Sequence, residues 1–257
     1  MPVNLTLSAG TLFAFLLVLA RISGALVFVP MPGMGNMPAP ARAGFSLAFT
    51  LALVSRWPAV DAATVSAGRL MVWVLAEATI GIAMGVTVAV VLESFTFAAQ
   101  MLGMPAGYGY ASTVDPTTQA DSGILLVLAQ LLAGMLFFAL GLDREVLRLF
   151  ALSLDRVPVG TYGLGLPAAQ AVIRLAGNIF SVGARVALPV VALLVMVDVA
   201  MALMGRLNAQ LQLLSLAFPA KMLVALLILS WTLALYPRIL NALTVEALGV
   251  TRRILGI

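Results

Sequence analysis

The 257-residue sequence contains neither cysteine nor histidine. Without cysteine there is no disulfide, no thiolate nucleophile and no cysteine metal site. Without histidine there is no serine–histidine protease, no zinc protease of the HExxH type and no haem held by imidazole. The sequence also lacks a phosphate-binding loop for a nucleotide. We therefore expect a protein that is not an enzyme and that carries no metal and no cofactor.

Charged residues are scarce as well. Asp, Glu, Lys and Arg make up 9% of the chain, against about 25% in a soluble domain. Hydrophobic residues make up 63%, and the mean hydropathy is +1.13. These values exclude a water-soluble globular enzyme, because most of the surface has to face lipid or other protein. In a membrane protein, the basic residues behind the net charge of +4 carry information on membrane topology rather than on affinity for nucleic acid. No nucleic-acid partner is therefore expected.

Four hydrophobic runs are long enough to cross the roughly 30 Å of hydrocarbon in a bilayer, which takes about 20 helical residues. They are residues 5–29, 70–92, 124–142 and 175–204. Two further runs, residues 43–54 and 222–235, are only about 12 and 14 residues long, too short to span a bilayer unaided. Moderately polar connections are predicted at residues 93–123 and 143–174.

The two short runs leave three interpretations open. In the first, the two runs are extended by polar residues that an assembly shields from lipid. In the second, the runs are broken helices that do not cross the membrane. In the third, both runs cross it and the chain is an ordinary protein with six spans. Pro189 and Pro219 predict kinks within the C-terminal helices. In each case the sequence predicts one all-α membrane domain with kinked helices and helical hairpins.

The segment from residue 103 to residue 121 is rich in glycine, tyrosine and small polar residues. Three glycines in its first seven positions disfavour a helix, because each costs about 1 kcal/mol against alanine. It is either a solvent loop between two spans or an ordered re-entrant loop, which survives at membrane depth only within protein or beside a water-filled path. In the second case it is a candidate plug. The candidate plug residues are Gly103, Met104, Gly107, Tyr108, Gly109, Tyr110, Val114, Asp115 and Pro116.

Four charged residues lie inside the apolar runs. They are Arg21, Glu77, Arg185 and Asp198. Because each costs about 3 kcal/mol to insert, we expect them to pair with one another or with charges on partner subunits. A proton relay is the alternative, and it would require more carboxylates than these two.

Two other motifs concern packing and partners. Gly81 and Gly85 form a GxxxG motif, which lets helix backbones approach closely. Residues 205–212 join the last two helices and hold no acidic residue, which fits either a simple connection or a docking surface for a partner. The candidate partner-facing residues are Arg206, Asn208 and Gln210.

Several motifs follow one another in a fixed order over most of the chain. They are Arg21-Ile22-Ser23-Gly24, Pro30, residues 37–44, Glu77 before Gly81 and Gly85, residues 107–116, Val157-Pro158-Val159-Gly160, Ala187-Leu188-Pro189, Gly205-Arg206 and Phe218-Pro219. In this order they resemble the flagellar biosynthetic protein FliR family of type III secretion export-gate subunits, which has injectisome counterparts. The sequence departs from the family at Gln100, Pro105 and Ala209, where glutamate, glutamine and proline are usual.

The resemblance implies a hetero-oligomeric export gate, in which one copy joins several P and Q subunits around a protein-conducting channel. It implies a P-subunit-like part over residues 1–174 and a Q-subunit-like helical hairpin over residues 175–257. It also implies that residues 107–121 plug the closed channel and that residues 206–212 lie toward the B switch subunit. The substrates would be unfolded export proteins, and the location would be the bacterial inner membrane, among lipid, at the base of a flagellum or injectisome.

We therefore predict a channel subunit that helps to form and plug the passage for unfolded proteins. One alternative is a small secondary transporter that uses Glu77 and Asp198 within broken helices, although the inverted repeats of such transporters are not found. Another is an intramembrane enzyme acting on lipid or isoprenoid substrates. The spaced acids supply neither clustered metal ligands nor a nucleophile with a base for that chemistry.

Overall fold

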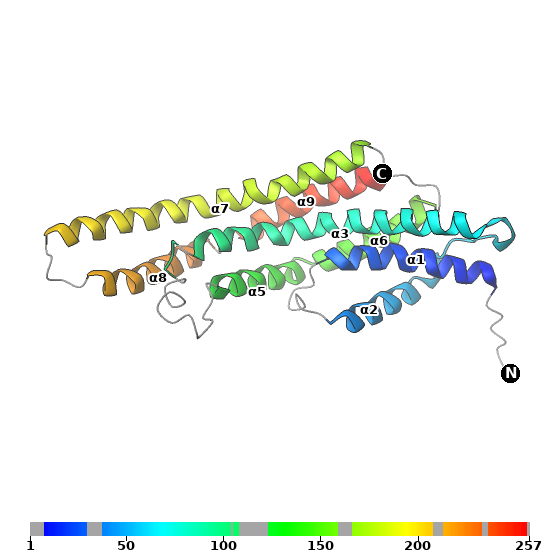
Figure 1. Ribbon diagram of the computed structural model, residues 1–257, viewed down its shortest axis with the longest axis horizontal. Helices are drawn as coiled ribbons and strands as arrows, with labels where there is room; N and C mark the ends of the chain where they lie inside the picture. The colour runs from blue at the N-terminus through cyan, green and yellow to red at the C-terminus, as the bar shows by residue number, and fades with distance from the viewer. Residues whose placement is uncertain are drawn as a thin grey trace. The chain divides into compact units, whose positions relative to one another are not determined.

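The computed structural model describes residues 8–29, 38–103, 105–107, 123–158, 166–207, 213–232 and 236–255. These residues form α-helices and two short 3₁₀ helices, with no strand among them. The elements are α1 (Ala9–Phe28), α2 (Ala39–Ala52), η1 (Val54–Arg56), η2 (Ala62–Thr64), α3 (Ala67–Gly103), α5 (Gly123–Ala139), α6 (Leu142–Arg156), α7 (Leu166–Leu207), α8 (Leu213–Thr232) and α9 (Tyr236–Leu255) (Figure 1). The prediction of an all-α membrane protein is confirmed.

Three helices among the described residues are long and apolar enough to cross a membrane: α1, α3 and the Ala169–Arg206 part of α7. They coincide with three of the four predicted spans. The fourth predicted span corresponds to α5, which passes the same test only together with α6. Between α5 and α6 the helix breaks at Gly141, whose φ of 69° favours glycine.

Helices α3 and α7 are much longer than the hydrophobic runs predicted. They contain 37 and 42 residues, which corresponds to about 56 and 63 Å and is roughly twice the hydrocarbon thickness of a bilayer. The predicted connection at residues 93–123 was therefore wrong in its first part, because α3 continues to Gly103.

The predicted connection at residues 143–174 was also wrong in part, because it contains α6. This helix is amphipathic, and one face buries Leu142, Val146, Leu149, Phe150 and Leu154. Acidic residues lie in its first turn and Arg156 lies in its last turn, an arrangement that the helix dipole favours. A scan for long apolar runs misses such a helix, because charged residues interrupt its sequence.

The short run at residues 43–54 corresponds to α2, whereas residues 222–232 of the other short run belong to the longer α8. Helix α8 begins at Leu213, nine residues before that run. Pro219 lies within α8, and Pro237 lies in the first turn of α9, where its fixed φ is well suited.

The chain divides into two compact units, which we describe separately. Unit 1 comprises residues 1–90, 141–176 and 244–257. Its core contains Val18, Ile22 and Leu26 of α1 and Leu154 of α6, against which Phe49, Leu53 and Trp57 pack. The buried hydroxyls of Thr87 in α3 and Thr251 in α9 lie 2.8 Å apart and form a hydrogen bond.

Unit 2 comprises residues 91–140 and 177–243. Its core joins α3, α5, α7 and α8 through Ala98, Leu102, Ala106, Leu125, Ala187, Val190, Leu194 and Ala225. The ring of Tyr236 packs against Phe95 at 5.0 Å between centroids, and burial raises the pKa of the Tyr236 hydroxyl. The sequence-based division into residues 1–174 and 175–257 concerns likeness to other subunits, and it stays a prediction.

Candidate functional site

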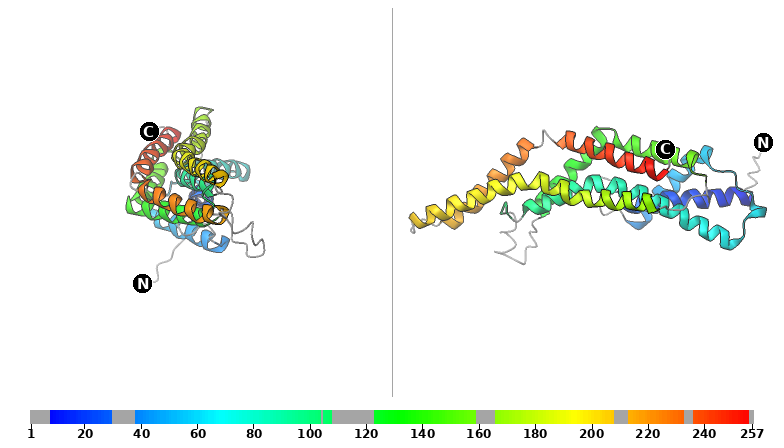
Figure 2. Two further views of the ribbon diagram at one scale, coloured as in Figure 1. Left: turned by 90° about the vertical axis from the view of Figure 1, so that its left-hand side faces the viewer. Right: turned by 90° about the horizontal axis from the view of Figure 1, so that it is seen from above.

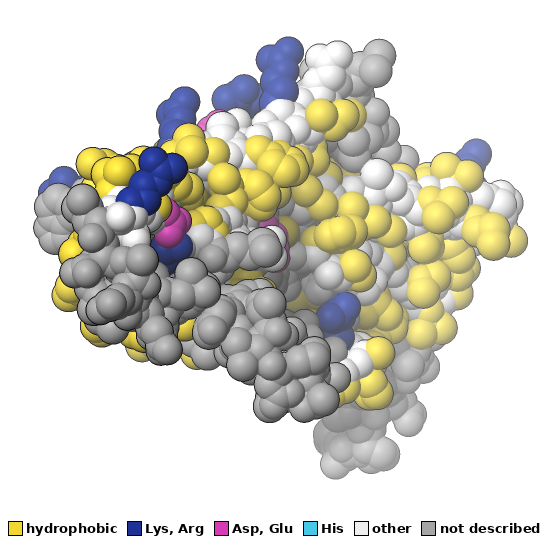
Figure 3. All heavy atoms as spheres, turned by 60° about the vertical axis from the view of Figure 1, so that its left-hand side comes forward, with side chains coloured by type: hydrophobic (Ala, Val, Ile, Leu, Met, Phe, Trp, Pro, Cys, Tyr) yellow, Lys and Arg dark blue, Asp and Glu magenta, His cyan; other side chains and the backbone are white. Residues whose placement is uncertain are grey.

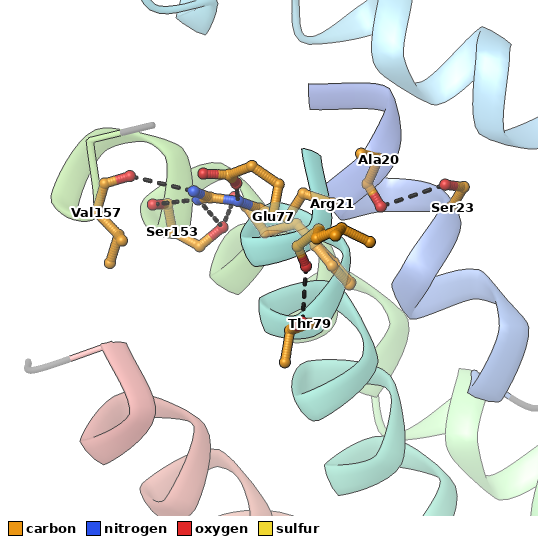
Figure 4. A network of polar contacts seen from close by, with 9 residues as sticks. Ala20, Arg21, Ser23, Glu77, Thr79, Ser153 and Val157 are labelled. Carbon is orange, nitrogen blue, oxygen red and sulfur yellow. Dashed lines mark hydrogen bonds and ion pairs between the residues drawn. The ribbon is translucent and has the colours of Figure 1, made fainter. Parts of the chain in front are cut away.

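Arg21 and Glu77 form a buried ion pair between α1 and α3 (Figure 4). The Arg21 Nε donates a hydrogen bond to the Glu77 Oε2 at 2.5 Å, and the two side chains are 1% and 0% exposed. The prediction that charges inside the apolar runs pair with one another is thus confirmed for these two residues.

The same guanidinium also holds the C-terminal end of α6. Its Nη1 donates to the backbone carbonyl of Ser153 at 2.7 Å and to the Ser153 Oγ at 3.2 Å, and its Nη2 donates to the carbonyl of Val157 at 3.2 Å. The carbonyl of Ser153 also accepts the backbone N–H of Val157, the C-cap residue of α6, at 3.1 Å, so Arg21 is its second donor. Arg21 therefore ties the end of α6 to α1 while it neutralises Glu77, and we call Arg21, Glu77, Ser153 and Val157 the arginine clasp.

Helices α1 and α3 lie side by side (Figures 1 and 2), and their backbones approach closely beside the arginine clasp. A Cβ atom on Gly81 would lie 1.9 Å from the carbonyl oxygen of Arg21, and one on Gly85 would lie 2.4 Å from that of Ala25. A Cβ atom on Gly24 would lie 2.5 Å from the carbonyl oxygen of Ala78. The GxxxG prediction is therefore confirmed, and Gly24 adds a third contact from the opposite helix.

Asp198 of α7 pairs with Lys221 of α8 within unit 2. The Lys221 side chain is 13% exposed and the Asp198 side chain 47% exposed. Both acids that the transporter hypothesis required, Glu77 and Asp198, are therefore occupied by cations of the same chain. The two acids belong to different helix pairs, Glu77 to α1 and α3 and Asp198 to α7 and α8.

Arg185 is exposed on α7, as Asp198 is, but it differs from the other three charges in its partners. It makes no ion pair with any carboxylate of the described residues. For Arg185 the prediction of pairing within the chain is therefore not fulfilled in this part of the molecule, and the alternative of a partner subunit remains.

The candidate plug falls largely outside the described residues. Met104 and residues 108–122, with Tyr108, Gly109, Tyr110, Val114, Asp115 and Pro116, lie outside them. Gly103 is the last residue of α3 and is buried, and residues 105–107 form a turn that ends at Gly107 with a φ of 84°. The role of this segment as a plug stays a prediction.

The partner-facing residues of the hairpin are also only partly described. Arg206 lies in the last turn of α7 and is exposed, whereas Asn208 and Gln210 lie outside the described residues. The docking role of these three residues stays a prediction.

The sequence did not lead us to predict that Ser153 contacts Arg21 or that Lys221 is the partner of Asp198. Ser153 acts mainly through its backbone carbonyl, so its residue type carries little signal. Lys221 could have been found, because it is the only lysine of the chain and lies near an intramembrane acid. We also placed Glu93 in a connection, whereas this exposed acid lies inside α3.

Comparisons with known proteins bear on the whole chain. The model of a family described as bacterial export proteins, family 1, matches residues 12–247. The flagellar biosynthetic protein FliR of Escherichia coli is 28% identical over 208 residues, which cover 81% of this chain and 79% of that protein. The FliR protein of Caulobacter vibrioides is 25% identical over 234 residues, covering 90% and 92%. That of Bacillus subtilis is 25% identical over 225 residues, covering 84% of each.

Proposed function

Because the chain belongs to family 1 of the bacterial export proteins, we propose that it is a subunit of the flagellar type III export gate. In this role it helps to form and plug the channel that passes unfolded proteins across the bacterial inner membrane. Its similarity to FliR proteins over most of its length supports the flagellar assignment. The secondary transporter hypothesis has no support, since Glu77 and Asp198 are both held in ion pairs.

The observation that carries the proposal is the exposed apolar face of α7. Exposed hydrophobic side chains extend along this helix from Ile173 to Met204, and only 17% of its most apolar window is buried. These two residues are about 46 Å apart along the axis, whereas the hydrocarbon layer is about 30 Å thick. Figure 3 shows one face on which hydrophobic side chains predominate. A bilayer alone does not cover the α7 face, so a subunit of a larger membrane assembly is the arrangement it fits.

The proposed mechanism is non-enzymatic. A channel wide enough for an unfolded chain must not leak ions when it is idle, and a segment rich in glycine and tyrosine can fill the lumen by packing. Such a segment has few regular backbone hydrogen bonds, so it yields when an extended chain enters. The energy for export comes from other components, because this sequence has no nucleotide-binding motif.

The proposed partners follow from membership of the gate. The P and Q subunits would surround this chain, the B switch subunit would lie near Arg206, and unfolded flagellar proteins would be the substrates. Similar exposed apolar helices on the P and Q subunits would cover the surface of α7.

Replacing residues 107–121 by a glycine–serine linker of equal length tests the plug. We expect ion leakage across the inner membrane to rise, because the linker offers no tyrosine or valine side chains to fill the lumen. We also expect the complex to migrate in native electrophoresis as the wild type does, together with two smaller membrane proteins. Leakage is measured as ion entry, reported by the fluorescence of an ion-sensitive dye, or as conductance of the complex in a planar bilayer.

The matched control is the same kind of replacement at residues 159–165, in the connection between α6 and α7. It should leave the conductance at the wild-type level. Unchanged conductance of a normally assembled 107–121 variant would contradict the plug role. Migration of the wild-type chain alone in mild detergent would contradict the whole proposal.

A further inference from the structure

Arg185 presents a guanidinium on the outer side of α7 that forms no ion pair within the described part of the chain. The packed side of this helix is defined by Gly183, Ala187, Val190 and Leu194, which are buried. Since each residue turns a helix by about 100°, Arg185 lies about 200° around the axis from Gly183 and also from Ala187. It therefore points away from the core of unit 2, and no carboxylate of the described residues reaches it.

The backbone adds a second unsatisfied polar group at the same level. Pro189 lies inside α7 and has no N–H, so the carbonyl of Arg185, four residues earlier, loses its helical hydrogen-bond donor. Pro189 is itself exposed. Such a break is tolerated within an apolar region when neighbouring protein satisfies the freed group. One exposed place on α7 thus presents a cationic donor and a carbonyl that Pro189 deprives of its usual helical donor.

Lipid alone does not account for Arg185. Exposed apolar side chains lie above and below it along the axis. Leu188, 56% exposed, lies about 60° around the helix from Arg185, whereas Phe180, 64% exposed, lies about 140° around it and packs against Phe97. If the hydrocarbon layer begins at the level of Leu188, then the side chains of Phe180 and Ile173 are exposed to water. If the layer extends as far as Phe180, then the guanidinium of Arg185 lies in hydrocarbon, at a cost of about 3 kcal/mol. A protein surface that covers the apolar residues and offers an opposite charge removes both problems.

We infer that Arg185 is the docking point for an apolar helix of a neighbouring export-gate subunit that carries an aspartate or glutamate. The carboxylate accepts hydrogen bonds from the guanidinium, while the flanking apolar side chains of the two helices pack together. On that face Ser181 and Ala192 are small, so they leave the guanidinium accessible. The inference rests on the proposed function and adds the chemistry of one contact within the gate.

The test compares four variants of the full chain in the assembled complex. Arg185→Glu should lower the amount of co-purified smaller subunit at least tenfold, because it places like charges together. Arg185→Leu should also lower it, because it leaves the partner's carboxylate unpaired, whereas Arg185→Lys should retain most of it. Arg253→Glu, on the exposed side of α9, is the control and should leave co-purification unchanged.

A crosslink identifies the subunit that lies against Arg185 in the assembled complex. Because the chain has no cysteine, Ser181→Cys provides a single thiol, one turn from Arg185 on the same face, for a maleimide–benzophenone probe. We expect the probe to attach to a helix of a smaller subunit that contains an acidic residue, and reversal of that acid to lysine should restore assembly of Arg185→Glu.

The inference is overturned if Arg185→Leu and Arg185→Glu assemble and export as the wild type does. It is equally overturned if the probe attaches only to lipid or to a second copy of this chain. Failure of the proposed function gives a different result, because the wild-type chain would then co-purify with no smaller subunit at all.

Discussion

Arg21→Leu is expected to destabilise the protein by about 3–5 kcal/mol, because removal of one partner leaves the other charge of a buried ion pair uncompensated. Glu77 is 0% exposed and would keep its carboxylate in the core of unit 1. The carbonyl of Val157 would lose the hydrogen bond from Arg21 at the same time, and the carbonyl of Ser153 would lose one of its two donors. In thermal unfolding of the detergent-solubilised protein we expect the midpoint to fall by about 10 °C.

Two further variants separate the ion pair from the loss of packing. The double variant Arg21→Leu, Glu77→Leu should be more stable than Arg21→Leu alone, because it leaves no unpaired charge. Arg148→Ala removes an exposed ion pair with Glu145 on the surface of α6, and its effect should stay below about 1 kcal/mol. If Arg21→Leu and Arg148→Ala had equal effects, the clasp would not be holding α1, α3 and α6 together.

Gly81→Ala is expected to destabilise the protein by about 3 kcal/mol, the upper end of the range for an overpacked interior. The new methyl group would lie 1.9 Å from the carbonyl oxygen of Arg21. That oxygen belongs to the backbone of α1, so it cannot move without separating the two helices. The separation would also displace the arginine clasp. Thermal unfolding and the level of the protein in membranes measure the effect.

Gly44→Ala provides the matched control for this substitution. Gly44 lies inside α2, and nothing lies within 4 Å of a Cβ atom placed on it. There the substitution should stabilise the protein by about 0.5–1 kcal/mol, because alanine favours a helix. A stabilising effect at both positions would contradict the close approach of α1 and α3.

The parts of the fold that could be predicted from the sequence are those with a strong local signal. The helices α1, α3 and α7 follow from long apolar runs, and close packing of α3 against another helix follows from Gly81 and Gly85. The need of isolated intramembrane charges for partners also follows. The structure was required to show that the packed helix is α1 and that Arg21 pairs with Glu77.

Other features depend on tertiary contacts that a local pattern does not carry. Helix α6 is stable because one face packs into unit 1 and Arg21 holds its last turn, and neither condition is visible in its polar sequence. The full lengths of α3 and α8 were missed because Glu93 and Lys221 interrupt the apolar runs. The plug role of residues 107–121 was predicted from composition and from the family resemblance, and it stays a prediction.

Four charged residues, Glu77, Asp198, Arg206 and Arg185, fall into three classes with different consequences for function. Glu77 and Asp198 are neutralised within the chain, so they stabilise helix packing. Arg206 lies at the end of α7, where a partner can reach it. Arg185 lies on the outer face of an apolar helix. A transporter would place its charges around a central site, whereas Glu77 and Asp198 are each paired with a cation of a neighbouring helix.

Crosslinking from position 110 to an export substrate stalled in the channel tests the central claim most directly. A photoreactive amino acid replaces Tyr110, and a substrate fused to a tightly folded domain is arrested during export. The account predicts a crosslink between position 110 and the arrested chain, and none from position 148 on the exposed face of α6. Absence of a crosslink from position 110 in an intact complex that holds the arrested chain would contradict the account.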